Sequence, residues 1–164
     1  MIKSVKAIFL FLLISSLISL SFIDKNKTNI GLKIGDKAPE ISLINDSQSI
    51  DLKKLNGNFV LISFWASYDA ESRERNAMLS NAASKINNLQ VVSVSFDEYE
   101  SIFKETINND QLRKADCFVE LTGESSNIFK SYELKKGFSN YLLDNKGNII
   151  AKNINSDQLF SLVN

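Results

Sequence analysis

The sequence predicts an α/β fold in which a central mixed β-sheet is flanked by helices. Two segments, 59–65 and 89–96, are almost continuously apolar, which is typical of central strands covered on both faces. The segment between them, 69–87, carries apolar residues at helical spacing, so the three segments predict a βαβ unit. Segment 140–152 places a tight-turn sequence between two apolar runs and predicts an antiparallel hairpin.

The elements on the N-terminal side follow from the same patterns. Alternation at 41–43 predicts a short strand, 45–49 is rich in turn residues, and 51–57 predicts one helical turn ended by glycine. In the helix 69–87, the side chains expected to face the core are Met78, Leu79, Ala82, Ala83 and Ile86.

The second half of the chain is expected to continue with helices and short strands. A helix should begin at Asp97 and carry the apolar residues Ile102, Phe103 and Ile107. We then expect a short strand or extended segment at 117–121 and a short helix at 125–134. The inward side chains of that helix should be Ile128, Phe129 and Tyr132. A helix at 156–163, with Ser156 as its N-cap, should close the chain.

The composition indicates a globular protein without a strong charge bias. Hydrophobic residues make up 44% of the chain and include 11 Phe, enough for a sizeable core. Lys plus Arg and Asp plus Glu number 19 each, so we expect no nucleic-acid partner. Histidine is absent, which excludes His-based acid–base and nucleophilic catalysis and most transition-metal sites. We predict neither a metal site nor a cofactor.

Cys117 is the only cysteine in the sequence, so no internal disulfide can form. In an exported protein a lone cysteine is either buried as a small apolar residue or left to pair with another molecule. We favour the buried position, because free cysteine is among the most buried residue types.

The N-terminus resembles an export signal. Lys3 and Lys6 precede an uncharged apolar run, and Ser19-Leu20-Ser21 offers a small-x-small cleavage site, so residues 1–21 predict a signal peptide. The alternative is an uncleaved membrane anchor, for which the uncharged run 7–23 is at the short limit of about 17 to 25 residues. Residues 22–33 then form a linker and 34–164 one domain. We expect an exported protein of the periplasm or cell envelope that meets the membrane only through an uncleaved leader.

Four segments, in this order, carry a family resemblance. They are Gly35-Asp36-Lys37-Ala38-Pro39, the L-x-x-L-x-G-x-F-V segment at 52–60, Phe64-Trp65-Ala66-Ser67 with the later Arg73, and the sequence Y-L-L-D-N-K-G at 141–147. Together they make residues 34–164 similar to the TlpA/ResA-type thioredoxin-like proteins, which are relatives of the AhpC/TSA redoxins. The resemblance implies a thioredoxin-like fold and an exported or membrane-tethered disulfide reductase of the cell envelope.

The chain departs from this family at the positions that carry its chemistry. The family pattern W-A-x-W-C-x-x-C-R aligns with 65–73, where Asp69 and Ser72 replace the attacking and resolving cysteines. Neither residue can form a disulfide. The family also has a cis-proline shortly before Tyr141, where Phe138 aligns with it. Because a cis bond before a non-proline residue costs about 2.5 to 4 kcal/mol, we predict a trans bond and an altered groove.

The two replacement residues allow structural and functional interpretations. Asp69 can be a helix N-cap, or it can form an acid–base or cation site with Glu71. Ser72 can be a first-turn residue facing water or the backbone, or a nucleophile, although no histidine exists to activate it. We favour the structural interpretation of both residues.

Two functional hypotheses follow. In the first, the chain is a redox-inactive thioredoxin-like protein that binds an envelope protein or peptide client through Trp65, Tyr68, Asp69 and Phe138. In the second, it is a thiol-disulfide oxidoreductase or peroxiredoxin-like enzyme that uses Cys117 with an external thiol. A purely structural alternative is that Trp65 covers the sheet edge and Phe138 fills the space left by proline.

Overall fold

The computed structural model describes residues 29–46, 49–54 and 57–163. The predicted leader, 1–21, and most of the predicted linker lie outside these residues. Asn29 and Gly31 of that linker are described, and both form backbone hydrogen bonds with Lys37. Among the described residues, no helix is long and apolar enough to cross a membrane.

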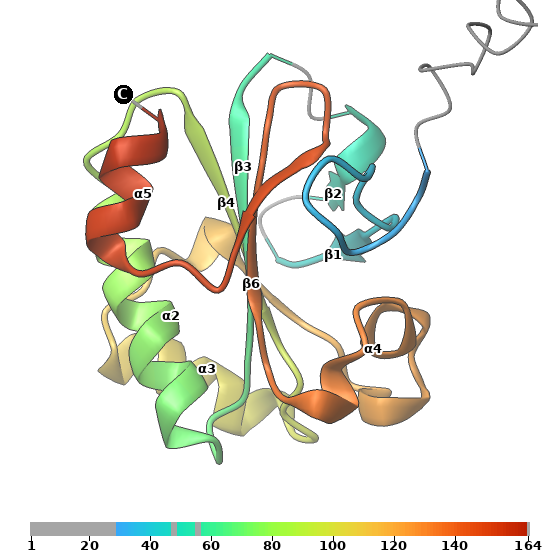
Figure 1. The fold of residues 1–164 in the computed structure, drawn as a ribbon. Coiled ribbons are helices and arrows are strands. Elements are labelled where there is room, and N and C mark those ends of the chain that lie inside the picture. The colour runs from blue at the N-terminus through green and yellow to red at the C-terminus, as the bar shows by residue number, and fades with distance from the viewer. Residues whose placement is uncertain (1–28, 47–48, 55–56, 164) are drawn as a thin grey trace, which may run out of the picture.

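A mixed five-stranded sheet forms the centre of the fold, as predicted (Figure 1). Its strands are β3 (Phe59–Trp65), β4 (Leu89–Ser95), β5 (Cys117–Val119), β6 (Asn140–Leu143) and β7 (Ile149–Lys152). Their spatial order is β5-β4-β3-β6-β7. Strands β3, β4 and β5 run parallel, whereas β6 and β7 form the predicted antiparallel hairpin, with β6 beside β3.

Helices and a small second sheet cover the two faces of the central sheet. Figure 1 shows α2 (Ala70–Ala83), α3 (Glu100–Asn109) and α5 (Ser156–Val163) on one side. On the other side lie α4 (Asn127–Ser131) and the antiparallel pair β1 (Ser42–Ile44) and β2 (Ser49–Asp51). Short 3-10 turns occupy Leu52–Lys54, Lys114–Asp116, Gly123–Ser125 and Leu134–Lys136.

The central strands contribute side chains to both faces, which explains their nearly continuous apolar sequence. Leu61 of β3 belongs to the apolar cluster under α2 and α5, which includes Leu79 and Leu159. The next residue, Ile62, belongs to the cluster on the opposite face, together with Phe129 of α4. Successive side chains of a strand point to opposite faces, so a strand covered on both sides needs apolar residues at every position.

The helix after β3 differs from the prediction in length and in its buried face. It ends at Ala83 rather than at 87. The backbone amides that follow donate to carbonyls three residues back instead of four, from Lys85 N to Ala82 O and from Ile86 N to Ala83 O. Met78, expected in the core, is 53% exposed, and Asn76 is fully buried instead. The Asn76 amide oxygen accepts a hydrogen bond from the hydroxyl of Ser93 on β4, which lets a polar residue face the sheet.

Three other elements also differ from the prediction. Helix α3 begins at Glu100 rather than at Asp97, and Ile102 is 44% exposed. The helix expected over 125–134 is interrupted after Ser131, because Glu133 has a positive φ of 52°. Strand β2 occupies a region that was predicted as turn and helical turn.

The predicted cap of α5 is displaced by one residue. The side-chain oxygen of Asn155 accepts a hydrogen bond from Gln158 N, and the Gln158 side chain accepts one from Asn155 N. This reciprocal capping box makes Asn155 the N-cap and leaves Ser156 as the first residue of the helix.

Candidate functional site

The candidate site lies where β3 ends and α2 begins. The bend after Trp65 brings Asp69 to the start of α2, and the loop before β6 brings Phe138 alongside. A hollow between them is lined by residues of both segments, including Asp69, Glu71 and Phe138. We call the surface formed by Tyr68, Asp69, Glu71 and Phe138 the Tyr68 surface.

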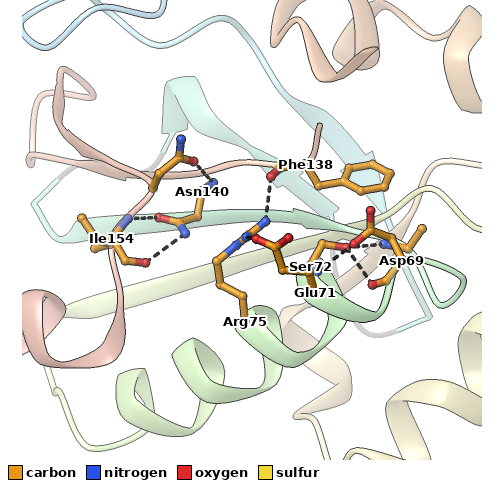
Figure 2. Close-up of polar contacts among 9 residues, drawn as sticks. Asp69, Glu71, Ser72, Arg75, Phe138, Asn140 and Ile154 are labelled. Carbon is orange, nitrogen blue, oxygen red and sulfur yellow. Dashed lines mark hydrogen bonds and ion pairs between the residues drawn. The ribbon is translucent and has the colours of Figure 1, made fainter. Parts of the chain in front are cut away.

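Asp69 is the N-cap of α2, which confirms the structural interpretation of this residue. Its backbone is extended (φ −103°, ψ 95°), and its carboxylate accepts a hydrogen bond of 2.8 Å from Ser72 N (Figure 2). The charge therefore sits at the positive end of the helix dipole and satisfies one of the free amide groups of the first turn.

Ser72 is buried, with an exposed fraction of 2%. Its hydroxyl donates to the backbone oxygen of Asp69 over 3.1 Å and accepts from Ala66 N over 3.4 Å. Both contacts are with the backbone of the bend, so the hydroxyl fixes the start of the helix. A buried hydroxyl that already donates its proton to a carbonyl is poorly placed to act as a nucleophile.

Arg75 fixes the loop that carries Phe138. Its guanidinium donates to the backbone oxygen of Phe138 over 2.6 Å and forms an ion pair with Glu71 over 3.2 Å (Figure 2). The preceding Gly137 has a φ of 119°, a conformation that favours glycine. All peptide bonds among the described residues are trans, in agreement with the prediction for the bond before Phe138.

Tyr68 and Phe138 form the outer end of a series of aromatic contacts. Tyr68 is 72% exposed, and its ring centroid lies 6.4 Å from that of Phe138. The half-buried Phe138 stacks on Phe96, with centroids 5.9 Å apart, and Phe96 meets Phe129 edge-on at 5.3 Å. Because Phe96 and Phe129 are buried in the core, these contacts connect the exposed tyrosine to the core.

Trp65 does not contribute to this surface, which corrects the prediction for this residue. Its side chain is fully buried against Phe103 of α3, and its indole nitrogen donates to Ser93 Oγ over 2.8 Å. It sits in the last register position of β3, paired with Ser95, and belongs to the core cluster that also contains Cys117. Placement within the strand, rather than in the bend, keeps the indole away from solvent.

Asp97 has a role in this site that was not predicted from the sequence. Its buried carboxylate accepts hydrogen bonds from Ser67 N (2.9 Å), Ser67 Oγ (2.5 Å) and Ser95 Oγ (2.7 Å). These bonds attach the bend next to Tyr68 to the end of β4. One feature of the sequence could have indicated this role. Asp97 directly follows an apolar strand that carries serines at alternate positions, Ser93 and Ser95.

Cys117 lies on β5, apart from the Tyr68 surface. It is 2% exposed and packs with Trp65, Phe103 and Ile107, which confirms the predicted buried position. Burial raises the pKa of the Cys117 thiol to about 12, so the reactive thiolate is scarce near neutral pH. The cavities that it borders do not include Asp69 or Ser72 in their lining.

Within residues 29–46, 49–54 and 57–163, no group of three or more Cys, Asp or Glu residues is arranged to hold a metal ion. The carboxylates of Asp69 and Glu71 already have partners, the first in the helix cap and the second in Arg75. The site is therefore built from a helix cap, an exposed tyrosine beside a half-buried phenylalanine, and surface charges.

Comparison with known proteins gives one family and several similar structures. The AhpC/TSA family model matches residues 34–152. A thioredoxin-like protein from Parabacteroides distasonis is 38% identical, with 82% of this chain and 97% of that chain covered and a TM-score of 0.75. A thiol-disulfide oxidoreductase from Bacteroides fragilis is 28% identical, with coverages of 77% and 99% and a TM-score of 0.67. No match was found among curated proteins.

A more distant structure shares the fold alone. A secreted thiol-disulfide isomerase from Corynebacterium glutamicum is 15% identical, with 85% of this chain and 92% of that chain covered and a TM-score of 0.65. The fold is thus thioredoxin-like, as the sequence resemblance implied.

Proposed function

We propose that this chain binds a partner protein or peptide and does not exchange disulfides. The premise is that the chain belongs to the AhpC/TSA family and has a thioredoxin-like fold. The binding site is the Tyr68 surface. The observation that carries the proposal concerns Asp69 and Ser72, which align with the two cysteines of the TlpA/ResA-type proteins that the chain resembles. Asp69 caps helix α2, and the Ser72 hydroxyl donates to the backbone oxygen of Asp69.

The chemistry of thiol exchange supports the first part of this proposal. Exchange needs a thiolate that attacks and a second thiol that resolves the mixed disulfide. Neither position at the start of α2 carries sulfur, and Cys117 is buried with a raised pKa on another strand. A one-thiol enzyme acting through Cys117 would first have to expose this residue, so the structure favours it less than partner binding.

The exposed Tyr68 ring supports the second part of the proposal, that the chain binds a partner. Exposed tyrosine is common in binding sites, where its ring contributes a large contact area with little loss of conformational freedom. Tyr68 is 72% exposed, and its ring lies beside that of Phe138 at a tilt of 57°. Arg75 keeps the Phe138 loop in one position, which lowers the cost of ordering this surface on binding.

We also propose that the protein acts outside the cytoplasm, in the periplasm or cell envelope. The leader predicted at residues 1–21 supports this location. A partner would then be an envelope protein or an exported peptide segment.

A capture experiment tests partner binding. The chain beginning at residue 22, which keeps every described residue, is immobilised and exposed to envelope extract under crosslinking. We expect a captured partner with the wild-type chain and loss of that partner with Tyr68→Ser. Ile44→Ser is the matched control, because Ile44 is 77% exposed on β1. Equal capture by all three proteins, or none by the wild type, contradicts the proposed site.

Thiol labelling tests the enzyme alternative. We expect Cys117 in the native chain to react slowly with a maleimide and to react fully after denaturation, because its side chain is 2% exposed. Labelling of the native chain as fast as that of the unfolded chain would instead support a thiol enzyme.

A further inference from the structure

The Tyr68 surface lies at an edge of the sheet that gathers acidic residues. Strands β3, β4 and β5 are parallel, so the segments that follow them leave the sheet at the same edge. The first segment carries Tyr68 and Asp69, the second Glu98, and the third Glu124. Both glutamates are exposed.

Three cations bordering this edge have acidic partners, and the Lys130 ammonium donates a hydrogen bond to the carbonyl oxygen of Ser125, next to Glu124. Arg73 forms two hydrogen bonds, of 2.8 and 2.7 Å, with Asp110, and Arg75 is held by Glu71 and the Phe138 carbonyl. Lys136, which borders the hollow beside Phe138, pairs with Glu133. In the described part of the chain, no ion pair involves Glu98 or Glu124. The edge is thus acidic in a chain whose formal net charge is zero.

The same carboxylates act on the Tyr68 phenol. Partial burial raises the pKa of the Tyr68 phenol, and so do the negative charges of Asp97, Asp69, Glu124 and Glu98. Four carboxylates from three different loops therefore act on one aromatic ring. A cation placed over this ring would be attracted both by the ring face and by the surrounding charges.

We propose that the Tyr68 surface recognises a lysine- or arginine-containing extended segment of the partner, with the cationic side chain over the Tyr68 ring and within reach of Glu98 and Glu124. This inference rests on the proposed function and adds the chemical class of the ligand. An arginine suits the position well, because its planar guanidinium stacks on aromatic rings and also donates to carboxylates. The same charges repel acidic peptides.

The test uses two blocked peptides that differ only in charge. Acetyl-Gly-Leu-Arg-Leu-Arg-Gly-amide is compared with the peptide that has citrulline at both arginine positions, which keeps the side-chain shape and removes the charge. Dissociation constants are measured by calorimetry with the chain beginning at residue 22. We expect the arginine peptide to bind about five- to tenfold more tightly at low salt, and the difference to shrink at high salt.

Two double variants test whether the preference for the arginine peptide depends on Glu98 and Glu124. Glu98→Gln with Glu124→Gln should reduce the preference for arginine to less than about twofold, because both uncompensated charges are removed. Glu105→Gln with Asp157→Asn is the matched control, since these carboxylates are exposed on α3 and α5 and are not among the charges that act on Tyr68. The control variant should keep the full preference.

The outcomes separate this inference from the function on which it rests. Equal affinities for both peptides, no binding of either, or a preference that survives in the Glu98/Glu124 variant each overturn recognition of a cationic segment. The capture experiment with Tyr68→Ser judges partner binding independently. If that capture is Tyr68-dependent while the peptides do not differ, the surface binds its partner by other chemistry.

Discussion

Asp69 carries its charge at the N-terminal end of α2, where the helix dipole favours an anion. Its carboxylate also accepts the Ser72 amide, and Ser72 in turn donates to the Asp69 carbonyl. Each of the two side chains is thus hydrogen-bonded to the backbone of the other residue within the first turn of the helix. Such a pair stabilises the helix start without requiring sulfur chemistry.

Removal of the cap gives the first prediction. Asp69→Ala should lower the free energy of unfolding by about 0.5 to 2 kcal/mol, because the Ser72 amide loses its partner and the dipole loses its anion. Urea denaturation measures this change. Asp69→Ser keeps a capping oxygen and should recover most of the loss, whereas an alanine variant as stable as the wild type would contradict the assigned cap.

Cys117 gives a pH-dependent prediction. The native thiol has a pKa of about 12 against an ordinary value of 9.0, so between these pH values the unfolded chain releases a proton that the native chain keeps. Stability contributed by Cys117 is therefore full below pH 9 and is lost as the pH rises toward 12, by at most about 1.4 kcal/mol per pH unit.

The measurement compares urea denaturation of the wild type and Cys117→Ala from neutral pH to pH 11. Burial also raises the pKa of Tyr132, but this group is present in both proteins, so their difference isolates Cys117. We expect the stability difference between the two proteins to change above pH 9, with the wild type losing more. Parallel curves would show that the thiol is not protonated preferentially in the native state.

Among the elements, β6 is tied to the segment that leads into α5 by one buried side chain. The side-chain oxygen of Asn140 accepts a hydrogen bond from Ile154 N over 2.9 Å, and its side-chain nitrogen donates one to Ile154 O over 3.1 Å (Figure 2). Asn140 also pairs with Ser63 of β3 in the sheet register. It therefore joins the central sheet to the segment between β7 and α5.

Replacement of Asn140 tests this connection. Asn140→Ala should lower the free energy of unfolding by about 2 to 4 kcal/mol, because two buried backbone groups of Ile154 lose their partners. Thermal or urea denaturation measures the change. Asn145→Ala, in the exposed turn between β6 and β7, is the control and should stay within about 0.5 kcal/mol of the wild type. Similar losses in both variants would contradict the role assigned to Asn140.

Most elements could be predicted because they depend on local sequence patterns. The continuous apolar runs of β3 and β4 and the turn sequence of the β6–β7 hairpin identify strands without knowledge of their neighbours. The exposure of Met78 could not be predicted, since it depends on Asn76 finding Ser93 on another strand. Strand β2 was missed because its Ser49 and Asp51 are typical of turns, and its strand character depends on pairing with β1.

The candidate site was predicted in part for the same reason. The Asp69 cap depends only on residues three positions apart, so the sequence contains its signal. The burial of Trp65 depends on contacts with Ser93 and Phe103, which lie far away in the sequence. The role of Asp97 likewise appears only when the bend and the end of β4 are brought together.

At the scale of the whole molecule, the fold is thioredoxin-like, while Asp69 and Ser72 stand where the sequence resemblance expects the two cysteines. Both faces of the sheet are covered by apolar clusters, and the edge where the parallel strands end carries the Tyr68 surface. A scaffold with this geometry can present a binding surface without catalysis, because fold and activity are separable. We therefore predict that the protein lacks disulfide reductase activity.

An insulin-reduction assay tests this central claim most directly. The chain beginning at residue 22 is assayed with a dithiol reductant beside Cys117→Ser and beside an active C-x-x-C thioredoxin as positive control. We predict that the wild type and Cys117→Ser both match the rate of the reductant alone, because neither has a thiol pair at the start of α2. Catalytic turnover by the wild type that disappears in Cys117→Ser would contradict the account.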